Sequence, residues 1–212
     1  MPHHYDAIII GAGHNGLTCA CYLARAGPNV LVLEQYHTVG GMTVTEEETL
    51  PGYWSDIHAS GYQLANLSPV PNELGLLDRY ELIEPEIPFS HAFPDGHIIS
   101  VHRDIEKTVA AAMFSPPPKI LKRVAHSPVD ISRKIISAVR GTLGQGAFLP
   151  YQSGSQRPIP ELGQYKTPVP NVYLCSSGSH PGPGVSMAPG RNAAQVIFDD
   201  LGLDFTRAIS SS

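Results

Sequence analysis

The sequence predicts an α/β fold that begins with a parallel β-α-β unit. Three observations indicate this fold. Residues 5–10 contain an apolar, β-branched run, residues 11–16 read Gly-Ala-Gly-His-Asn-Gly, and residues 29–34 form a second apolar run that ends at Glu34. A strand, a glycine turn and a helix in this order, followed by a second strand, are typical of the Rossmann-like dinucleotide-binding unit.

Each glycine of the first motif has its own expected role. Gly11 allows a sharp turn after the strand, Gly13 allows close approach of the backbone to a pyrophosphate, and Gly16 allows the helix to pack on the sheet. The helix N-terminus directs free N–H groups and its positive dipole end toward phosphates. Glu34 can accept hydrogen bonds from an adenosine ribose. The alternative is a glycine-rich turn that binds nothing, and the flanking strand, helix and terminal acid disfavour it.

The helix after this motif is expected to end at Gly27-Pro28. Its apolar positions recur at helical spacing and should face the sheet; they are Leu17, Ala20, Cys21 and Ala24. A second glycine pair, Gly40-Gly41, follows Glu34 in a polar loop. A nicotinamide dinucleotide does not require this pair, whereas the longer FAD needs a second close backbone approach. The pair therefore favours FAD.

The middle of the chain is expected to hold short elements. Residues 44–68 contain a short strand or loop with His58, which is a candidate to approach a flavin, although a lone histidine is more often structural. A short helix is expected at 72–77. Residues 80–101 predict a hairpin, with a strand at 81–84 and a turn at Asp95-Gly96.

A proline-rich connector is expected at residues 115–126, after a helix over 105–114. Ser127 and Asp130 have the spacing of a capping box, which predicts a new helix that ends at Gly141. Its expected buried face is Ile131, Ile135 and Val139. Its basic residues, Arg133 and Lys134, are expected to face solvent; the alternative is contact with an anionic membrane or a nucleotide phosphate.

The last part of the chain repeats the order of the first motif. Residues 171–175 predict a short buried strand, residues 176–187 a glycine-rich loop, and residues 188–201 a helix closed by Gly202. The loop can hold the other end of one long cofactor, and the helix dipole would stabilise negative charge on a reduced flavin. The long loop at 141–166 is expected to be functional because structureless stretches of that length are uncommon.

Composition narrows the class of protein. The chain has 212 residues, 42% of them hydrophobic, with twenty glycines and twenty prolines, which indicates a globular protein with many loops. The net charge of −5 gives no nucleic-acid signature, although residues 101–140 carry +5. Three cysteines, an odd number, predict reduced core thiols and a cytoplasmic location. The apolar N-terminal run is too short for a membrane span and is not expected to be a signal peptide.

Together these motifs resemble the phytoene-desaturase-like FAD-dependent oxidoreductases, a group similar to the wider amine-oxidase-type flavoproteins. The resemblance rests on the opening motif from Tyr5 to Gly16, on Glu34 followed by Gly40-Gly41, and on the stretch from Val172 to Ala194. It covers residues 4–115 and 127–204. It implies non-covalent FAD, bound at the pyrophosphate and ribose by the first motif and at the ribityl chain and flavin by the second. The full expected set is Gly11, Gly13, His14, Asn15, Gly16, Glu34, Gln35, Gly40, Gly41, Met42, Thr43, Gly178, Gly184, Val185, Ser186 and Met187.

The sequence departs from the family in its middle. The large central part that forms most of the family's substrate domain is replaced by the proline connector, and Ser176 and Met187 stand where glycine and a small residue are usual. The resemblance therefore implies a miniature Rossmann-like FAD-binding domain with a reduced β-hairpin and helix remnant of the substrate domain. The expected division is residues 1–78 with 141–204 for FAD, 79–140 for the remnant, and 205–212 as a flexible tail.

The leading functional hypothesis is an oxidoreductase whose FAD accepts hydride from NADH or NADPH and passes electrons to a quinone or another small apolar acceptor. His58 and His180 are weak catalytic candidates, and no metal is expected. The alternatives are a non-catalytic FAD-binding module that binds an isoprenoid or lipid or senses redox state, and a plain NAD(P)-binding domain. An exposed sheet edge predicts a homodimer or higher oligomer, and peripheral membrane contact is a further option.

Overall fold

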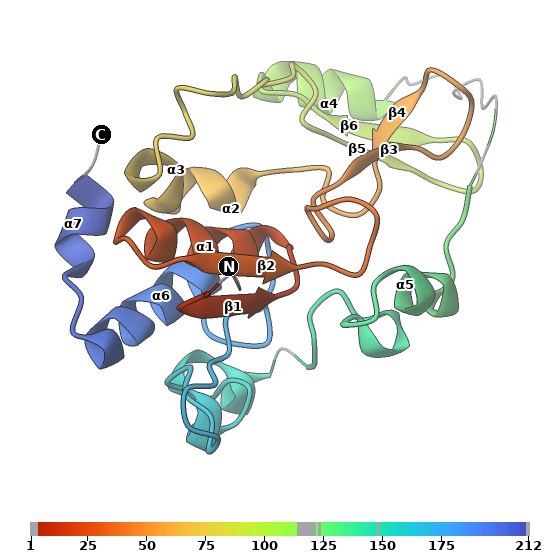
Figure 1. Cartoon of the computed structure of the whole chain (residues 1–212). Coiled ribbons are helices and arrows are strands. Elements are labelled where there is room, and N and C mark those ends of the chain that lie inside the picture. Colours follow the sequence, from red (N-terminus) through yellow and green to blue (C-terminus); the bar gives the residue numbers. More distant parts are fainter. Residues whose placement is uncertain (1–3, 114–121, 123, 148, 211–212) are drawn as a thin grey trace. The chain divides into compact units, whose positions relative to one another are not determined.

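The computed structural model describes residues 4–113, 122, 124–147 and 149–210 and divides into two units (Figure 1). The larger unit contains residues 1–77 and 125–212, and the smaller contains residues 78–124. The division expected from the sequence groups residues 125–140 with the smaller unit. The structure groups them with the larger unit because Lys134 Nζ bonds Glu46 at 2.6 Å and Glu48 at 2.8 Å.

The larger unit begins with the predicted β-α-β arrangement. Strand β1 (Ala7–Ile10) lies parallel to β2 (Val30–Leu33), in a register that pairs Ala7 with Val30 and Ile10 with Leu33. Helix α1 (His14–Arg25) connects them (Figure 1). Gly11 has a φ of +96°, which only glycine adopts without strain, and it makes the sharp turn between strand and helix. The predicted α/β fold class is confirmed.

Helix α1 packs against α6 (Ala188–Leu201) as well as against the sheet. The buried face of α1 is therefore wider than predicted and includes Cys19, Ala20, Tyr22 and Leu23. Two residues expected on this face, Cys21 and Ala24, are exposed instead. The prediction considered one packing partner, whereas the helix has two. Of the cysteines, Cys19 is buried, Cys175 is half-buried and Cys21 is exposed, and all three are free.

Residues 205–210, expected to be a flexible tail, form helix α7 (Phe205–Ser210). Its aromatic side chain explains this difference. The Phe205 ring lies 5.2 Å from the Tyr22 ring and 5.1 Å from the Phe198 ring. Arg25 Nη1 also donates a hydrogen bond to the Ala208 carbonyl at 3.1 Å. The end of α6, closed as predicted by Gly202 with a φ of +65°, therefore turns α7 back onto α1.

The connection after β2 contains short elements. Strand β3 (Thr45–Glu47) pairs antiparallel with β4 (Trp54–Asp56), and helices α2 (Gln63–Asn66) and α3 (Val70–Glu73) follow. The helix predicted at 72–77 is shorter and lies earlier, at Val70–Glu73: Pro71 is suited to the first turn of a helix, and the helix ends before Leu74. Glu73 fixes α3 in place: it accepts bonds from Arg191 Nε at 2.7 Å and Nη2 at 2.6 Å, and from the Tyr22 hydroxyl at 2.5 Å.

Helix α5 (Pro128–Lys134) has the predicted capping box, formed by Ser127 and Asp130. It ends at Lys134 rather than at Gly141, because Ile135 leaves the helix with φ −123° and ψ 92°. Val139, expected to be buried, is exposed in the turn η1 (Val139–Gly141). Lys134, expected to face solvent, is mostly buried between two glutamates.

The long loop that follows is built from single turns and not from a longer element. These turns are η2 (Pro150–Gln152), η3 (Gly154–Gln156) and η4 (Pro160–Leu162). The strand predicted at 171–175 is reduced to one bridge between Lys166 and Tyr173.

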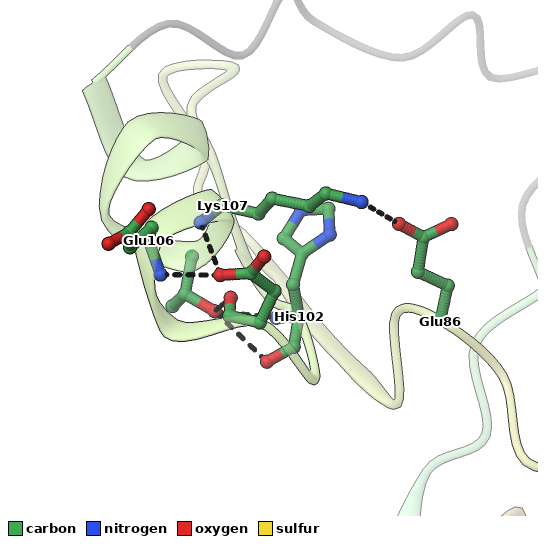
Figure 2. A network of polar contacts seen from close by, with 6 residues as sticks. Glu86, His102, Glu106 and Lys107 are labelled. Atoms are coloured by element: carbon green, nitrogen blue, oxygen red, sulfur yellow. Dashed lines mark hydrogen bonds and ion pairs between the residues drawn. The ribbon is translucent and has the colours of Figure 1, made fainter.

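The smaller unit contains the predicted hairpin and helix. Its strands are β5 (Phe89–Ala92) and β6 (Ile98–Val101), followed by α4 (Ile105–Met113). The predicted turn at Asp95-Gly96 is present, but the first strand begins at Phe89 and not at residue 81. Figure 2 shows the ion pair between Lys107 Nζ and Glu86 Oε1, at 2.6 Å, which ties α4 to the segment before β5. Most of the proline-rich connector expected at 115–126 lies outside the described residues.

Within the described ranges, no helix is both long enough and apolar enough to cross a membrane.

Candidate nucleotide-binding site

The first glycine motif opens into a cavity of about 370 Å³ in the larger unit. The cavity is built by five segments of the chain. They are the β1–α1 turn, the residues just after β2, the turn at Gly41-Met42, the end of α5 with the loop after it, and the start of the second glycine-rich loop. The lining residues are Ile10, Gly11, Gly13, His14, Asn15, Gly16, Glu34, Gln35, Tyr36, Gly41, Met42, Lys134, Ile135, Ile136, Ser137, Leu143, Gln145, Cys175, Ser176 and Ser177.

The two glycine turns of the N-terminal region touch one another. The Gly40 N–H donates to the Ala12 carbonyl at 2.8 Å, and a Cβ added at Gly41 would lie 3.1 Å from the Gly13 Cα. A Cβ added at Gly13 would meet no protein atom within 4 Å. Gly13 therefore leaves open space on its cavity side, where a phosphate can approach the backbone closely.

Glu34 is held at the cavity edge by two backbone groups. Its Oε1 accepts the Tyr36 N–H at 2.9 Å, and its Oε2 accepts the Ala12 N–H at 2.7 Å. The Tyr36 hydrogen bond is the largest cause that lowers the pKa of this carboxyl group, and the Ala12 bond adds to it. Glu34 is therefore ionised at neutral pH, and its remaining lone pairs can accept ribose hydroxyl groups.

Asn15 connects the first glycine motif to the C-terminal part of the chain. Its Nδ2 donates to Ser177 Oγ at 3.4 Å. A Cβ added at Gly190 would lie 2.1 Å from the Asn15 carbonyl oxygen, so the first turn of α6 is in direct contact with the first turn of α1. The N-termini of the two helices thus meet beside one cavity.

Arg157 holds the second glycine-rich loop against the cavity. Its side chain is 2% exposed, and its guanidinium donates to three backbone carbonyl groups. The acceptors are Ser177 at 3.1 and 3.2 Å, Ala147 at 3.2 Å and Gly144 at 2.5 Å. Burial lowers the pKa of this guanidinium. Sequence reasoning missed Arg157, since an arginine in a loop has no local pattern that distinguishes it from a solvated one.

The end of α5 and the following loop form a wall that sequence reasoning also missed. The only sequence signal for this wall was the basic character of the helix. Its basic residues were expected to face solvent, and contact with an anionic membrane or a nucleotide phosphate was the alternative. Lys134 does line the cavity, but Glu46 and Glu48 neutralise its charge. Although burial lowers the pKa of Lys134, hydrogen bonds to the two glutamates raise it overall. Lys134 therefore anchors the wall rather than presenting an unpaired charge.

The second glycine-rich loop contributes less than its sequence suggested. Only its first residues, together with Cys175, line the cavity, and Gly178, Gly184, Val185, Ser186 and Met187 do not. A Cβ at Gly184 would lie 2.4 Å from a Leu64 methyl carbon, so this glycine packs against protein. Met187 is buried in the core. Among the other predicted residues, Gly40 and Thr43 stand just outside the lining, where Thr43 Oγ1 donates to the Gly40 carbonyl at 2.6 Å.

The two histidines proposed as catalytic candidates lie away from this cavity lining. Burial is the largest cause that lowers the pKa of His58, whose ring is 6.4 Å from the His126 ring. His180 lines a second cavity of about 440 Å³, and its carbonyl accepts the Tyr165 hydroxyl at 2.8 Å. The structure therefore does not bring either imidazole into the lining of the nucleotide site.

Comparison with known proteins supports the reading of this geometry. Residues 9–74 match the family model of the NAD(P)-binding Rossmann-like domain. A limonene dehydrogenase chain of Castellaniella defragrans is 43% identical over 105 residues, which are 49% of this chain and 19% of that protein. Pyridine nucleotide-disulfide oxidoreductase domain-containing protein 2 of mouse is 44% identical over 82 residues, 39% of this chain and 14% of that protein.

All-trans-retinol 13,14-reductase of rat is 43% identical over 61 residues, which are 29% of this chain and 10% of that protein. The matched segments thus span less than a fifth of each of these relatives. The relatives carry oxidoreductase names, and the matched family model covers the second half of β1, all of α1 and β2, and the second glycine turn. The larger unit therefore contains a Rossmann-like α/β fold whose glycine turns border a nucleotide-sized cavity.

Proposed function

We propose that this protein is an FAD-binding oxidoreductase. One observation carries the proposal: the Asn15–Ser177 hydrogen bond and Arg157 join both glycine-rich regions at a single cavity. A nicotinamide dinucleotide would need only the N-terminal part of this site. A cavity that continues to the second loop suits a longer dinucleotide whose two halves are held by different segments.

The residues present fit FAD. The open space beside Gly13, the close approach of the two glycine turns and the ionised Glu34 supply a place for a pyrophosphate and a ribose. Gly11, Gly13 and Gly16 would hold the pyrophosphate, Glu34 the adenosine ribose, and residues 175–177 the flavin end. Bound FAD would supply hydride acceptance and electron transfer, and the protein would supply position and electrostatics.

For the substrate we propose a small apolar molecule, with NADH or NADPH as the electron donor and a quinone-type acceptor. The relatives' names mention limonene and all-trans-retinol, both apolar, and one relative is named for pyridine nucleotides. The finer assignment to phytoene-desaturase-like flavoproteins is proposed on the glycine motifs and Glu34 of the sequence. We propose a cytoplasmic location, with peripheral contact to membranes that hold such substrates.

We also propose that the protein forms a homodimer. Ile8 and Leu33 of the parallel sheet are 57% and 48% exposed. Parallel sheets are normally covered on both faces, so a second copy would remove these side chains from water. Light scattering after size-exclusion chromatography at micromolar concentration measures this, and a clean monomer contradicts it.

The cofactor is tested by adding FAD to the purified protein and recording the visible spectrum and the quenching of flavin fluorescence. We expect saturable binding with a flavin spectrum, and bleaching of the flavin bands by anaerobic NADH or NADPH in stopped flow. Gly13→Ala is the matched variant, since its methyl would enter the cavity. Saturable binding of NADH without any binding of FAD would instead establish a plain nicotinamide-binding domain.

A non-catalytic FAD-binding module is the second candidate. It is favoured by the position of His58 and His180, neither of which lines the cavity. A zebrafish relative, 50% identical over 48 residues, is also named an inactive all-trans-retinol 13,14-reductase. Tight FAD binding without bleaching by either nicotinamide nucleotide would support this candidate over the enzyme.

A further inference from the structure

The chain just after helix α5 contributes apolar side chains to the nucleotide cavity. Ile135, Ile136 and Leu143 line it, and Ile136 and Leu143 are 63% and 48% exposed. These side chains belong to neither glycine motif. Apolar surface in a ligand cavity is covered favourably by a ligand group that has an apolar face, because the surface then leaves water. This wall therefore suits a flat, uncharged part of the ligand.

The neighbours of the wall show which end of the cavity it borders. Lys134, the last residue of α5, has its Nζ 5.9 Å from the centre of the Tyr36 ring. Tyr36 also lines the cavity, and its N–H donates to Glu34 Oε1 at 2.9 Å. Ile135 and Ile136 follow Lys134 directly in the chain. They therefore belong to the Glu34 end of the cavity.

The loop after α5 continues to the other end of the cavity. Gln145, two residues after Leu143, accepts a hydrogen bond at its Oε1 from Ser176 Oγ at 3.1 Å, and both bonded residues line the cavity. The second glycine-rich loop begins there, at the end proposed for the flavin. Leu143 is therefore assigned to the flavin end, and Ile135 and Ile136 are the apolar side chains of the Glu34 end.

The charges beside the wall disfavour a phosphate group at this end. Lys134 is mostly buried and bonds Glu46 at 2.6 Å and Glu48 at 2.8 Å, so two carboxylates neutralise its charge. The ionised Glu34 adds a negative charge at the cavity edge. A pyrophosphate is therefore better held by the backbone N–H groups of the glycine turn. In a dinucleotide, the part beyond the adenosine ribose is the adenine ring, which is uncharged and has apolar faces.

We propose that Tyr36, Ile135 and Ile136 together form the subsite for the adenine ring of the bound dinucleotide. The inference rests on the proposed function and adds that the segment at the end of α5, more than ninety positions after Glu34, supplies part of this subsite. The subsite is formed before the ligand arrives. The bonds of Lys134 to its two glutamates fix the end of α5, and the capping box fixes its start, so binding orders few additional side chains.

Binding of FAD, FMN and ADP to the purified protein tests the two ends of the cavity separately, because FMN lacks the adenosine and ADP lacks the flavin. Flavin fluorescence measures FAD and FMN, and calorimetric titration measures ADP. Ile136→Ser should weaken FAD and ADP by the same factor, about fivefold, and leave FMN unchanged. Tyr36→Ala should do the same by about tenfold, although its backbone N–H can still bond Glu34, and Tyr36→Phe should bind as the wild type.

Val139→Ser is the matched control for Ile136→Ser. Val139 is β-branched like Ile136 and similarly exposed, at 65%, but it lies in η1 outside the cavity lining. This variant should bind all three ligands as the wild type does. Because both positions are exposed, neither substitution should cost much stability, which thermal unfolding measures. If Tyr36→Ala fails to fold, Ile136→Ser alone decides.

Photolabelling with an azido derivative of ADP locates the adenine directly. Peptide mass spectrometry should find the label on the peptides that hold Tyr36 or Ile136, and excess FAD should prevent it. Label on the peptide that holds Ser176, an unchanged FAD affinity in Ile136→Ser, or equal losses for FAD and FMN would overturn the subsite while leaving FAD binding intact.

The proposed function can fail separately from the subsite. Binding of ADP and NADH that weakens in Ile136→Ser, without any binding of FAD, would overturn the proposed function and retain the subsite. Absence of binding by FAD, FMN and ADP alike would overturn both.

Discussion

Replacement of Glu73 by glutamine tests how the C-terminal helix is attached to the β-α-β unit. The Glu73 carboxylate receives two bonds from Arg191 and one from the Tyr22 hydroxyl, and so joins α3, α6 and α1. The Arg191 and Glu73 side chains are 20% and 16% exposed. Removing one partner of a fully buried ion pair costs about 3–5 kcal/mol; because these side chains are partly exposed and glutamine keeps one acceptor, we expect about 2 kcal/mol.

Urea unfolding followed by far-ultraviolet circular dichroism measures this loss. With an m-value of about 2 kcal/mol/M, a loss of about 2 kcal/mol lowers the urea midpoint by roughly 1 M. Lys166→Gln is the matched control, since it breaks an ion pair with Asp200 on the same helix, α6, that is far more exposed. It should change the midpoint much less. Equal midpoints for Glu73→Gln and the wild type would refute the role given to this pair.

The pH dependence of the same difference provides an independent check. Burial raises the pKa of Glu73, but the hydrogen bonds from Arg191 and Tyr22 outweigh it and lower the pKa below the usual range. A lowered folded pKa means that the stabilisation is complete above the ordinary glutamate pKa, about 4.3, and is lost as the pH falls through the folded pKa. The gap between wild type and Glu73→Gln should therefore be constant from pH 6 to 8 and shrink below about pH 4.3. A gap that widens in acid would contradict this assignment.

Four substitutions separate ligand contact from packing. Gly16→Ala would place a Cβ 2.2 Å from the Gly11 carbonyl oxygen, so it should lower both the urea midpoint of unfolding and the affinity for FAD. Gly13→Ala has open space at its Cβ. It should weaken FAD binding about tenfold and leave the urea midpoint nearly unchanged. Arg157→Met leaves the Ser177, Ala147 and Gly144 carbonyl groups without the guanidinium that donates to them. Because the loop is then held less firmly, calorimetric titration should show weaker binding of FAD, and limited proteolysis should cut the 141–166 loop faster. Lys134→Met removes the cation that Glu46 and Glu48 share, so proteolysis near α5 should accelerate, and unchanged rates would argue against its anchoring role.

The parts of the fold that could be predicted depend on residues close together in sequence. The turn at Gly11, the capping box of Ser127 with Asp130 and the closure of α6 at Gly202 are each specified within a few residues, and all three are present. The docking of α7 was not predictable in this way. It depends on Phe205 meeting Tyr22, 183 positions earlier, and a short polar segment gives no local sign of such a contact.

The same limit explains the errors around the site. Lys134 was expected in solvent because a basic residue on a helix face usually is, and its partners, Glu46 and Glu48, are more than eighty positions away. Arg157 was not considered, because its acceptors are backbone carbonyl groups, and these have no sequence signature. Both residues position the cavity wall without forming part of any motif.

A glycine motif alone does not show whether its glycines bind a ligand. A glycine can be required because a ligand approaches the backbone or because another part of the chain does, and the two demands look identical in sequence. What an added Cβ would meet separates them. At Gly13 it would meet open space, whereas at Gly16, Gly184 and Gly190 it would meet protein atoms within 2.4 Å. The second glycine-rich loop was predicted to bind flavin by analogy with the first, yet its Gly184 is needed for contact with Leu64 and lies beside His14. That loop therefore borders the cofactor site through its first residues, Ser176 and Ser177, whereas its Gly184 serves the packing of the chain.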